Sequence, residues 1–363
     1  MKKSNTIKAL LIGLALLSGI YSCKKNHPGP QQRFDISQTN LVADTAGYGA
    51  AKIDPALKNA WGIAVNPTGV VWISANHSAT SPVYDKTGAT LRPPVTIPSV
   101  NAGDPGAPTG IVFNGSTDFG GNKFIFAGED GVITAWAGGN AAVKVADRST
   151  AGAVYKGLAI ATDGGASFLY AANFKGKKIA VFDSNFSLVT TKPFADTSIP
   201  ADFGPFNIQN IGGMLYVTYA KLKGPDNEDD QAGPGNGYVN IFRPDGTLVG
   251  RFASTGTLNS PWGITHAPAG FAAPFETILV GNFGDGRINV FSLQGIYIGQ
   301  LQNNGQTIGI EGLWALDFLK PNATNTDPLF FTAGPHDESH GIFGSLKSTI
   351  TTTGGNMGNS SGY

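Results

Sequence analysis

The sequence predicts an all-β fold: a six-bladed β-propeller closed by an N-terminal strand in the last blade. Two observations predict the blades. A glycine followed by an apolar run recurs at steps of 48, 47, 48, 58 and 49 residues, which is a period typical of propeller blades. Within each step, short apolar runs alternate with turns rich in glycine and proline. A third observation predicts the closure, because Leu41–Thr45 repeats the pattern of Pro193–Thr197.

Six copies of the repeat can be placed along the chain. They open at Gly62, Gly110, Gly157, Pro205, Gly263 and Gly312. In the first copy we expect strands at 61–66, 70–74, 82–84 and 91–97. The last copy ends near residue 346, after its third strand. We therefore expect residues 34–46 to supply the missing strand, which leaves no exposed sheet edge at the seam.

Composition limits the classes of function. The chain has 363 residues and 41% hydrophobic residues, so one large domain with an ample core is expected. Only 14% of the residues are charged and the formal net charge is zero. A basic surface is therefore not expected, and we expect no nucleic-acid partner.

The N-terminus has the features of an export signal. Lysines near Met1 precede an apolar run, Ala9–Ile20, which is too short to span a bilayer. Cys23, the one cysteine of the chain, follows Ser22 as in a bacterial lipobox. We expect a lipoprotein signal peptide at 1–22, lipidation of Cys23 and an exported, membrane-anchored protein on the periplasmic or cell-surface face. The alternative is an ordinary secretory signal with an incidental cysteine.

The remaining boundaries follow from composition. Residues 23–33 are polar and contain two prolines, so they are expected to form a tether. Residues 34–346 hold the propeller. Residues 347–363 are rich in serine, threonine, glycine and asparagine and are expected to form a disordered tail.

Several stretches resemble known repeats. The pattern Gly-Ile-Ala-Val-x-Pro-x-Gly-x-x-Trp-Ile, which begins at Gly62, is similar to NHL-type repeats. The segments 59–64, 227–237 and 260–264 resemble a family of uncharacterised exported bacterial β-propellers. This resemblance implies the fold and an exported location, and it implies no particular activity.

A ligand site is expected where the loops before the first strands and between the second and third strands face one opening. These loops hold the ligand-binding candidates Asn59, Trp61, Asn76, His77, Asn173, Trp262 and Asn282. The alternative for the asparagines is turn formation. The alternative for the tryptophans is packing between blades.

Two clusters of chemically active residues stand out. The catalytic candidates are Glu129, Glu311, His336 and His340, as metal ligands or general bases. Four carboxylates in one inserted loop are candidate calcium ligands: Asp226, Glu228, Asp229 and Asp230. That loop lacks the EF-hand spacing, and a solvated acidic insertion is the alternative.

The first functional hypothesis is a binding or interaction module for a small-molecule, glycan or protein ligand, held at a membrane by its lipid anchor. The alternative is a metal-dependent, lactonase-like hydrolase or lyase that uses a divalent cation such as calcium at the channel mouth. That alternative rests on analogy with other propellers.

Overall fold

The computed structural model describes residues 31–101, 103–320 and 322–353. The expected signal segment 1–22 and Cys23 lie outside the described residues. The secondary structure of the described part is almost entirely β. Its helical segments are three single turns, η1 (Asn76–Ser78), η2 (Phe119–Gly121) and η3 (Ser149–Ala151). In these stretches of the chain, no helix is long and apolar enough to cross a membrane.

Five sheets have the regular four-stranded form of a propeller blade. The first contains β3 (Ala60–Val65), β4 (Val71–Ala75), β5 (Thr80–Tyr84) and β6 (Thr90–Thr96). The second contains β7 (Pro108–Phe113), β8 (Phe124–Gly128), β9 (Val132–Trp136) and β10 (Val143–Asp147). The third contains β11 (Tyr155–Asp163), β12 (Ala166–Asn173), β13 (Lys178–Phe182) and β14 (Leu188–Val189). The fourth contains β15 (Phe203–Ile211), β16 (Met214–Lys221), β17 (Gly237–Phe242) and β18 (Leu248–Ser254). The fifth contains β19 (Pro261–Ala267), β20 (Thr277–Asn282), β21 (Ile288–Ser292) and β22 (Tyr297–Gln300).

The remaining sheet has seven strands, so the expectation of six equivalent blades is wrong: five sheets have the regular form. Its strands are β1 (Gln31–Ala43), β2 (Lys52–Ile53), β23 (Gln302–Asn303), β24 (Gln306–Thr307), β25 (Leu313–Asp317), β26 (Leu329–Ala333) and β27 (Ile342–Thr353). The order is β24-β23-β1-β27-β26-β25, with β2 also paired to β1. The difference arises because β1 is long enough to pair at both edges, and the hairpin around Asn304 adds to its outer edge.

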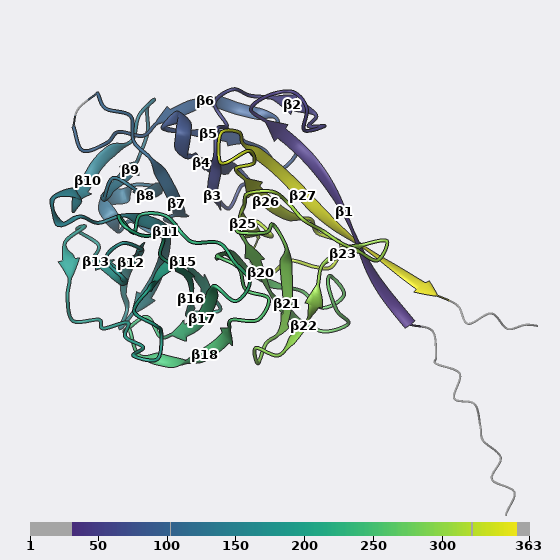
Figure 1. Cartoon of the computed structure of the whole chain (residues 1–363). Helices are drawn as coiled ribbons and strands as arrows, with labels where there is room; N and C mark the ends of the chain where they lie inside the picture. Colours follow the sequence, from purple (N-terminus) through teal and green to yellow (C-terminus); the bar gives the residue numbers. More distant parts are fainter. Residues whose placement is uncertain (1–30, 102, 321, 354–363) are drawn as a thin grey trace, which may run out of the picture. The chain divides into compact units, whose positions relative to one another are not determined.

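The all-β propeller is nevertheless clear within residues 34–351 (Figure 1). The innermost strands pack side by side in chain order, from β3 through β7, β11, β15 and β19 to β25, and β25 packs against β3. The recurrent glycines allow this close approach. A Cβ added at Gly62 would lie 2.5 Å from the carbonyl oxygen of Thr109, and one at Gly263 would lie 2.5 Å from that of Trp314.

The fourth copy departs from this glycine pattern. Pro205 opens the phrase in the sequence, but Asn207 takes the inner position, and its amide donates to the carbonyl oxygen of Trp262 at 2.9 Å. A side chain is tolerated there because its polar end is satisfied by the neighbouring strand.

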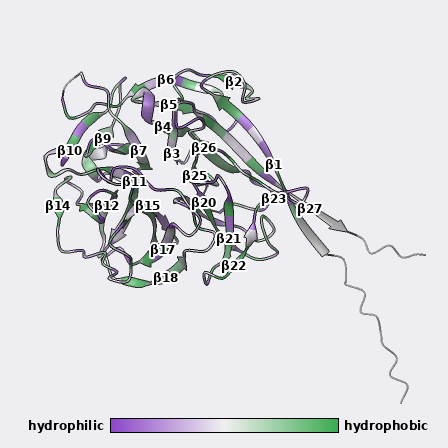
Figure 2. Cartoon of the chain, in the orientation of Figure 1, coloured by the Kyte–Doolittle hydropathy of each residue, from purple (hydrophilic) through white to green (hydrophobic). Residues whose placement is uncertain are grey.

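Strand β1 lies against the C-terminal part of the chain. The carboxylate of Asp44 accepts the backbone N–H of Gly341 at 3.0 Å and lies 3.0 Å from Nδ1 of His340. Ile36, Val42 and Ala43 are fully buried. Figure 2 shows hydrophobic and hydrophilic bands along β1, as expected for a strand with one buried face.

Two expected boundaries shift. Strand β27 runs to Thr353, so residues 347–353 belong to a strand and not to the expected disordered tail. Threonines recur in this segment, and their β-branched side chains favour extended backbone. Likewise, β1 begins at Gln31, inside the expected tether.

Candidate functional site

Aromatic side chains from the second positions of three innermost strands, β3, β19 and β25, close one end of the central channel. Trp61 and Trp314 stack with ring centroids 3.7 Å apart, and Trp262 meets both rings edge-on at 6.3 and 5.8 Å. All three side chains are buried. Next to these rings, the cavity that the innermost strands enclose has a volume of only about 20 Å³. The channel at this level is therefore too narrow for a ligand, and the rings of Trp61 and Trp262 contact each other and Trp314.

A buried cation lies over this aromatic layer. Lys156 is 3% exposed, and its Nζ lies 5.2 Å from the ring centroid of Trp61. The ammonium donates to Oε1 of Glu129 and lies 3.4 Å from Oδ1 of Asp229. Burial lowers the pKa of Lys156, but Glu129 and the other carboxylates outweigh it and raise the pKa overall. Lys156 is therefore charged at neutral pH.

A second carboxylate, Glu338, is held beside this cation by an unusual turn. His336, Asp337 and Glu338 all have positive φ, at 58°, 49° and 63°. Three consecutive left-handed residues that are not glycine are costly, at about 1–2 kcal/mol each. Such strain persists only where the surroundings enforce it, and it gathers at functional sites.

The side chain of Glu338 is fixed by a relay of hydrogen bonds. Nδ2 of Asn59 donates to Oε2 of Glu338 at 2.6 Å, and Nε1 of Trp314 donates to Oδ1 of Asn59 at 3.0 Å. Burial raises the pKa of Glu338 to about 7, opposed by the Asn59 hydrogen bond and reinforced by repulsion from Glu129. This carboxyl therefore exchanges its proton near neutral pH.

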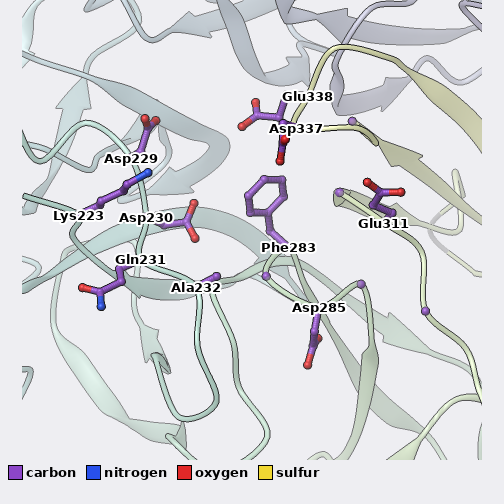
Figure 3. A pocket seen from close by; sticks show the side chains of 15 residues that line it. Lys223, Asp229, Asp230, Gln231, Ala232, Phe283, Asp285, Glu311, Asp337 and Glu338 are labelled. Atoms are coloured by element: carbon purple, nitrogen blue, oxygen red, sulfur yellow. The ribbon is translucent and has the colours of Figure 1, made fainter.

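Beside Glu338 opens a cavity with a volume of about 1040 Å³ (Figure 3). It lies among the β16–β17, β20–β21 and β26–β27 loops and the segment that precedes β25. Its charged lining residues are Lys223, Asp229, Asp230, Asp285, Glu311, Asp337 and Glu338. Phe283 also lines it, and stacks on Trp314 with centroids 4.0 Å apart. We call this cavity the mouth pocket.

One carboxylate of the mouth pocket, Asp230, is buried next to a hydroxyl and not next to a cation. Its Oδ2 makes no hydrogen bond of normal geometry, and Ser260 is the neighbouring donor. Burial raises the pKa of Asp230, opposed by the Ser260 hydroxyl and then by Lys156. In Figure 3 the side chain of Asp230 points from its loop toward the ring of Phe283. A ligand that supplies a cation would be stabilised there.

The asparagine candidates divide into two groups. Oδ1 of Asn173 accepts the backbone N–H groups of Val154 and Gly176, and Nδ2 of Asn282 donates to the carbonyl oxygen of Thr257. These two amides form turns and do not line the mouth pocket. Asn76 instead reaches the next sheet, where its Nδ2 donates to Oε2 of Glu129 at 2.8 Å.

The catalytic candidates converge in part: the backbone N–H of His336 donates to Oε1 of Glu311 at 2.9 Å, and the ring centroids of His336 and His340 lie 5.8 Å apart. His340 contacts Asp44 and the ring of Tyr48, so it anchors the N-terminal segment. His336 is exposed at the rim, with its Nδ1 4.0 Å from Oε1 of Glu311. His77 is exposed on η1. Of the four catalytic candidates, Glu129 lies beside Lys156 and Glu311 lines the mouth pocket.

The calcium candidates are also dispersed. Glu228 pairs with Lys175, Asp229 faces Lys156, and Asp226 is exposed. Across residues 31–101, 103–320 and 322–353, no three aspartate, glutamate, histidine or cysteine side chains are grouped as metal ligands. Ammonium groups meet two of the four candidate carboxylates, Glu228 and Asp229.

Three residues that build the site were not predicted as site residues, although Lys156 and Glu338 lie in loops that the sequence places at the opening: Lys156, Phe283 and Glu338. Lys156 precedes Gly157, which opens the third copy, and Phe283 follows Asn282 at the end of β20. Their places in the repeat put both beside the opening. Their chemical role depends on contacts between sheets, and no spacing along the chain encodes those contacts.

Comparisons with known proteins support the fold. Virginiamycin B lyase from Staphylococcus aureus superposes with a TM-score of 0.54 at 13% identity, covering 87% of this chain and 99% of that one. An auxiliary nutrient binding protein from Bacteroides ovatus gives a TM-score of 0.54 at 9% identity, covering 88% and 78%. At these identities the likeness concerns the fold alone. No family model matches the chain.

Two curated relatives are far more similar in sequence. Uncharacterized protein R648 of Acanthamoeba polyphaga mimivirus is 37% identical over 88% of this chain and 82% of its own length. Uncharacterized protein L690 of the same virus is 33% identical over 88% and 87%. These relatives are viral, and they do not support the exported bacterial family implied by the resemblance. The chain belongs to the same protein family as R648 and L690 of the mimivirus.

Proposed function

We propose that the protein is a binding module that holds a small polar molecule in the mouth pocket. The observation that carries the proposal is a cavity of about 1040 Å³ above a channel sealed by tryptophans. This volume is at the upper end of the range for small-molecule sites. The pocket combines one aromatic face with several polar groups, which is the usual composition of a ligand site.

Filling the pocket tests the proposal. A Cβ at Gly309, which lines the pocket, would meet only the carbonyl oxygen of Asp285 at 3.8 Å. Gly309→Phe should therefore fold and occupy the cavity. Gly138→Phe is the matched control, because Gly138 is exposed and has open space around it.

The readout is the thermal shift of each protein with a diverse library of small polar molecules. Compounds that stabilise the wild type and Gly138→Phe, but not Gly309→Phe, support the proposal. A library in which every stabilising compound acts equally on Gly309→Phe would refute the mouth pocket as the binding site.

A second candidate is a hydrolase or lyase in which Glu338 transfers a proton. The pKa of Glu338 near 7 and its fixed orientation favour this chemistry. If the pocket is catalytic, Glu338→Gln should abolish turnover of a bound substrate while the substrate still binds. If the enzyme is metal-dependent, it would also require a divalent cation such as calcium. Loss of turnover in EDTA tests this version of the hypothesis.

We also propose that the protein is exported and anchored through Cys23. This proposal is supported by the basic, apolar and small residues that precede Cys23. Cys23→Ala should release the protein from membranes on fractionation. A variant that still pellets with membranes would exclude the anchor.

Finally, we propose that the seven-stranded sheet acts as the sixth blade and that β1 closes the ring. The contacts of Asp44 with Gly341 and His340 support this proposal. Asp44→Ala should lower the free energy of unfolding by about 2–4 kcal/mol, since it leaves a buried N–H unpaired. A change below about 0.5 kcal/mol would show that the N-terminal segment does not hold the ring together.

A further inference from the structure

We propose that the mouth pocket takes a linear organic cation with two or more ammonium groups separated by an apolar spacer, the chemical class of diamines and polyamines. This inference rests on the proposed binding function and gives it a ligand class. The spacer would cross the ring of Phe283 while the ammonium groups meet carboxylates on either side.

The charge of the lining favours a cation. Six carboxylates and one lysine line the pocket, although the whole chain has a formal net charge of zero. The negative charge is therefore concentrated at this opening. A concave site lined by one sign of charge concentrates ligands of the opposite sign and speeds their association.

The arrangement of the carboxylates favours more than one cationic group. In Figure 3, Asp229 and Asp230 lie on one side of Phe283, and Glu311, Asp337 and Glu338 lie on the other side or above it. The two groups come from different loops, β16–β17 on one side and the segments flanking β25 and β27 on the other. An ammonium group has three N–H donors, so a single one cannot pair with all six carboxylates that line the pocket.

Phe283 supplies the surface between them. One face of its ring stacks on Trp314 with an interplanar angle of 18°. Since the ring also lines the pocket, its other surface is available to a ligand. An aromatic face attracts both methylene groups and ammonium groups.

Asp230 points to a missing cation. Its side chain points toward Phe283, and the hydroxyl of Ser260 and the charge of Lys156 are the groups that favour its ionised form. A buried carboxylate is normally paired with a cation or with several donors. Lys156 is already engaged by Glu129 and Asp229. An ammonium group with three N–H donors would complete the site.

A matched series of five-carbon probes tests the class. The probes are 1,5-diaminopentane, 1,5-pentanediol and glutarate, titrated calorimetrically into the full chain at pH 8 and low salt. They have the same spacer and differ in the charge of their ends. We expect the diamine to bind at least about tenfold more tightly than the diol, and glutarate not to bind. Added salt should weaken diamine binding.

The outcomes separate this inference from the proposed function. If the diol or glutarate binds as tightly as the diamine, the ligand class is wrong and the binding function stands. A second outcome is that none of the three probes binds, while library compounds stabilise the wild type and Gly138→Phe but not Gly309→Phe. The ligand class is then also wrong, and the binding function stands. If Gly309→Phe changes no binding at all, both proposals fail.

Isosteric variants test the residues. Asp230→Asn should weaken diamine binding about tenfold and leave diol binding unchanged, because it removes one facing charge. Asp226→Asn is the control, since Asp226 lies in the same loop, is exposed and does not line the pocket. Glu311→Gln, at an exposed position, replaces Asp230→Asn if that variant does not fold. Equal diamine affinity in the wild type and the pocket variant would overturn the inference.

Discussion

The amide of Asn59 donates a hydrogen bond of 2.6 Å to Oε2 of Glu338, although 279 positions separate the two residues. Asn59 immediately precedes β3, the first innermost strand, and Glu338 lies in the turn before β27. They meet because β25 packs against β3 and brings the two ends of the propeller together. The same contact fixes a carboxyl at the mouth pocket, so ring geometry and site geometry are coupled.

Glu338→Gln should stabilise the protein at alkaline pH. The pKa of Glu338 is about 7 in the folded protein, above the value near 4.3 expected when unfolded. Because the folded pKa is raised, ionisation costs stability as pH rises from about 4.3 to 7, and the full cost remains above pH 7. Glutamine mimics the neutral acid and cannot ionise. Urea unfolding at pH 8 should show a gain of about 1–3 kcal/mol.

The same comparison at pH 4 is its control. There Glu338 is protonated in the folded protein and mostly protonated in the unfolded chain, so the variant and the wild type should differ by less than about 0.5 kcal/mol. A gain of equal size at pH 4 and pH 8 would show that the substitution acts through packing and not through ionisation.

Lys156→Met should destabilise the protein. It removes the cation that faces Glu129 and leaves that partly buried carboxylate without its donor, at a cost of about 1–3 kcal/mol, whereas Asp229 is mostly exposed. Lys156→Met combined with Glu129→Gln should recover a large part of this loss, because glutamine needs no cation. A double variant as unstable as the sum of the two single variants would mean that the ion pair contributes nothing specific.

Asn59→Gly should destabilise the protein through lost hydrogen bonds alone. Asn59 has a positive φ of 47°, which glycine adopts without strain. The substitution leaves the buried Nε1 of Trp314 without its acceptor, which costs about 1–3 kcal/mol. Asn59→Ala should cost about 1 kcal/mol more, because alanine is strained at this φ. Equal stability of the two variants would contradict the backbone argument.

Metal ions should not affect stability. No group of three potential metal ligands is found in the described stretches of the chain, and ammonium groups meet several of the candidate carboxylates. The melting temperature should therefore be the same within about 1 °C in EDTA and in millimolar calcium. A rise of several degrees with calcium would restore the acidic loop as a calcium site.

The repeat period predicted the propeller because spacing along the chain sets strand length and turn position. Gly62 and Gly263 mark the close approach of innermost strands, and the structure explains why glycine is needed there. The seven-stranded sheet could not be predicted. Its extra strands, β23 and β24, have two residues each, and they exist only because β1 offers an edge to pair with.

The sequence indicates which loops surround the site better than it indicates which side chains act there. Glu311 lines the mouth pocket, at the opening where its loop position placed it, and Asp230, predicted as a calcium ligand, lines the same pocket. Asn173 and Asn282 recur at matching positions because turns recur, and their amides are used by the backbone. The role of Glu338 depends on a left-handed turn and on Asn59, a residue from the other end of the propeller. Neither feature has a sequence signature.

The most direct test of the account is calorimetric titration of 1,5-diaminopentane between pH 6 and pH 8 in buffers of different ionisation enthalpy. A cation near Glu338 favours its charged form, so binding should tighten as pH rises through about 7, by at most tenfold per pH unit. Near pH 6.5, binding should release up to about one proton, and Glu338→Gln should abolish both effects. Affinity that is independent of pH, or proton uptake on binding, would contradict an organic cation in the mouth pocket.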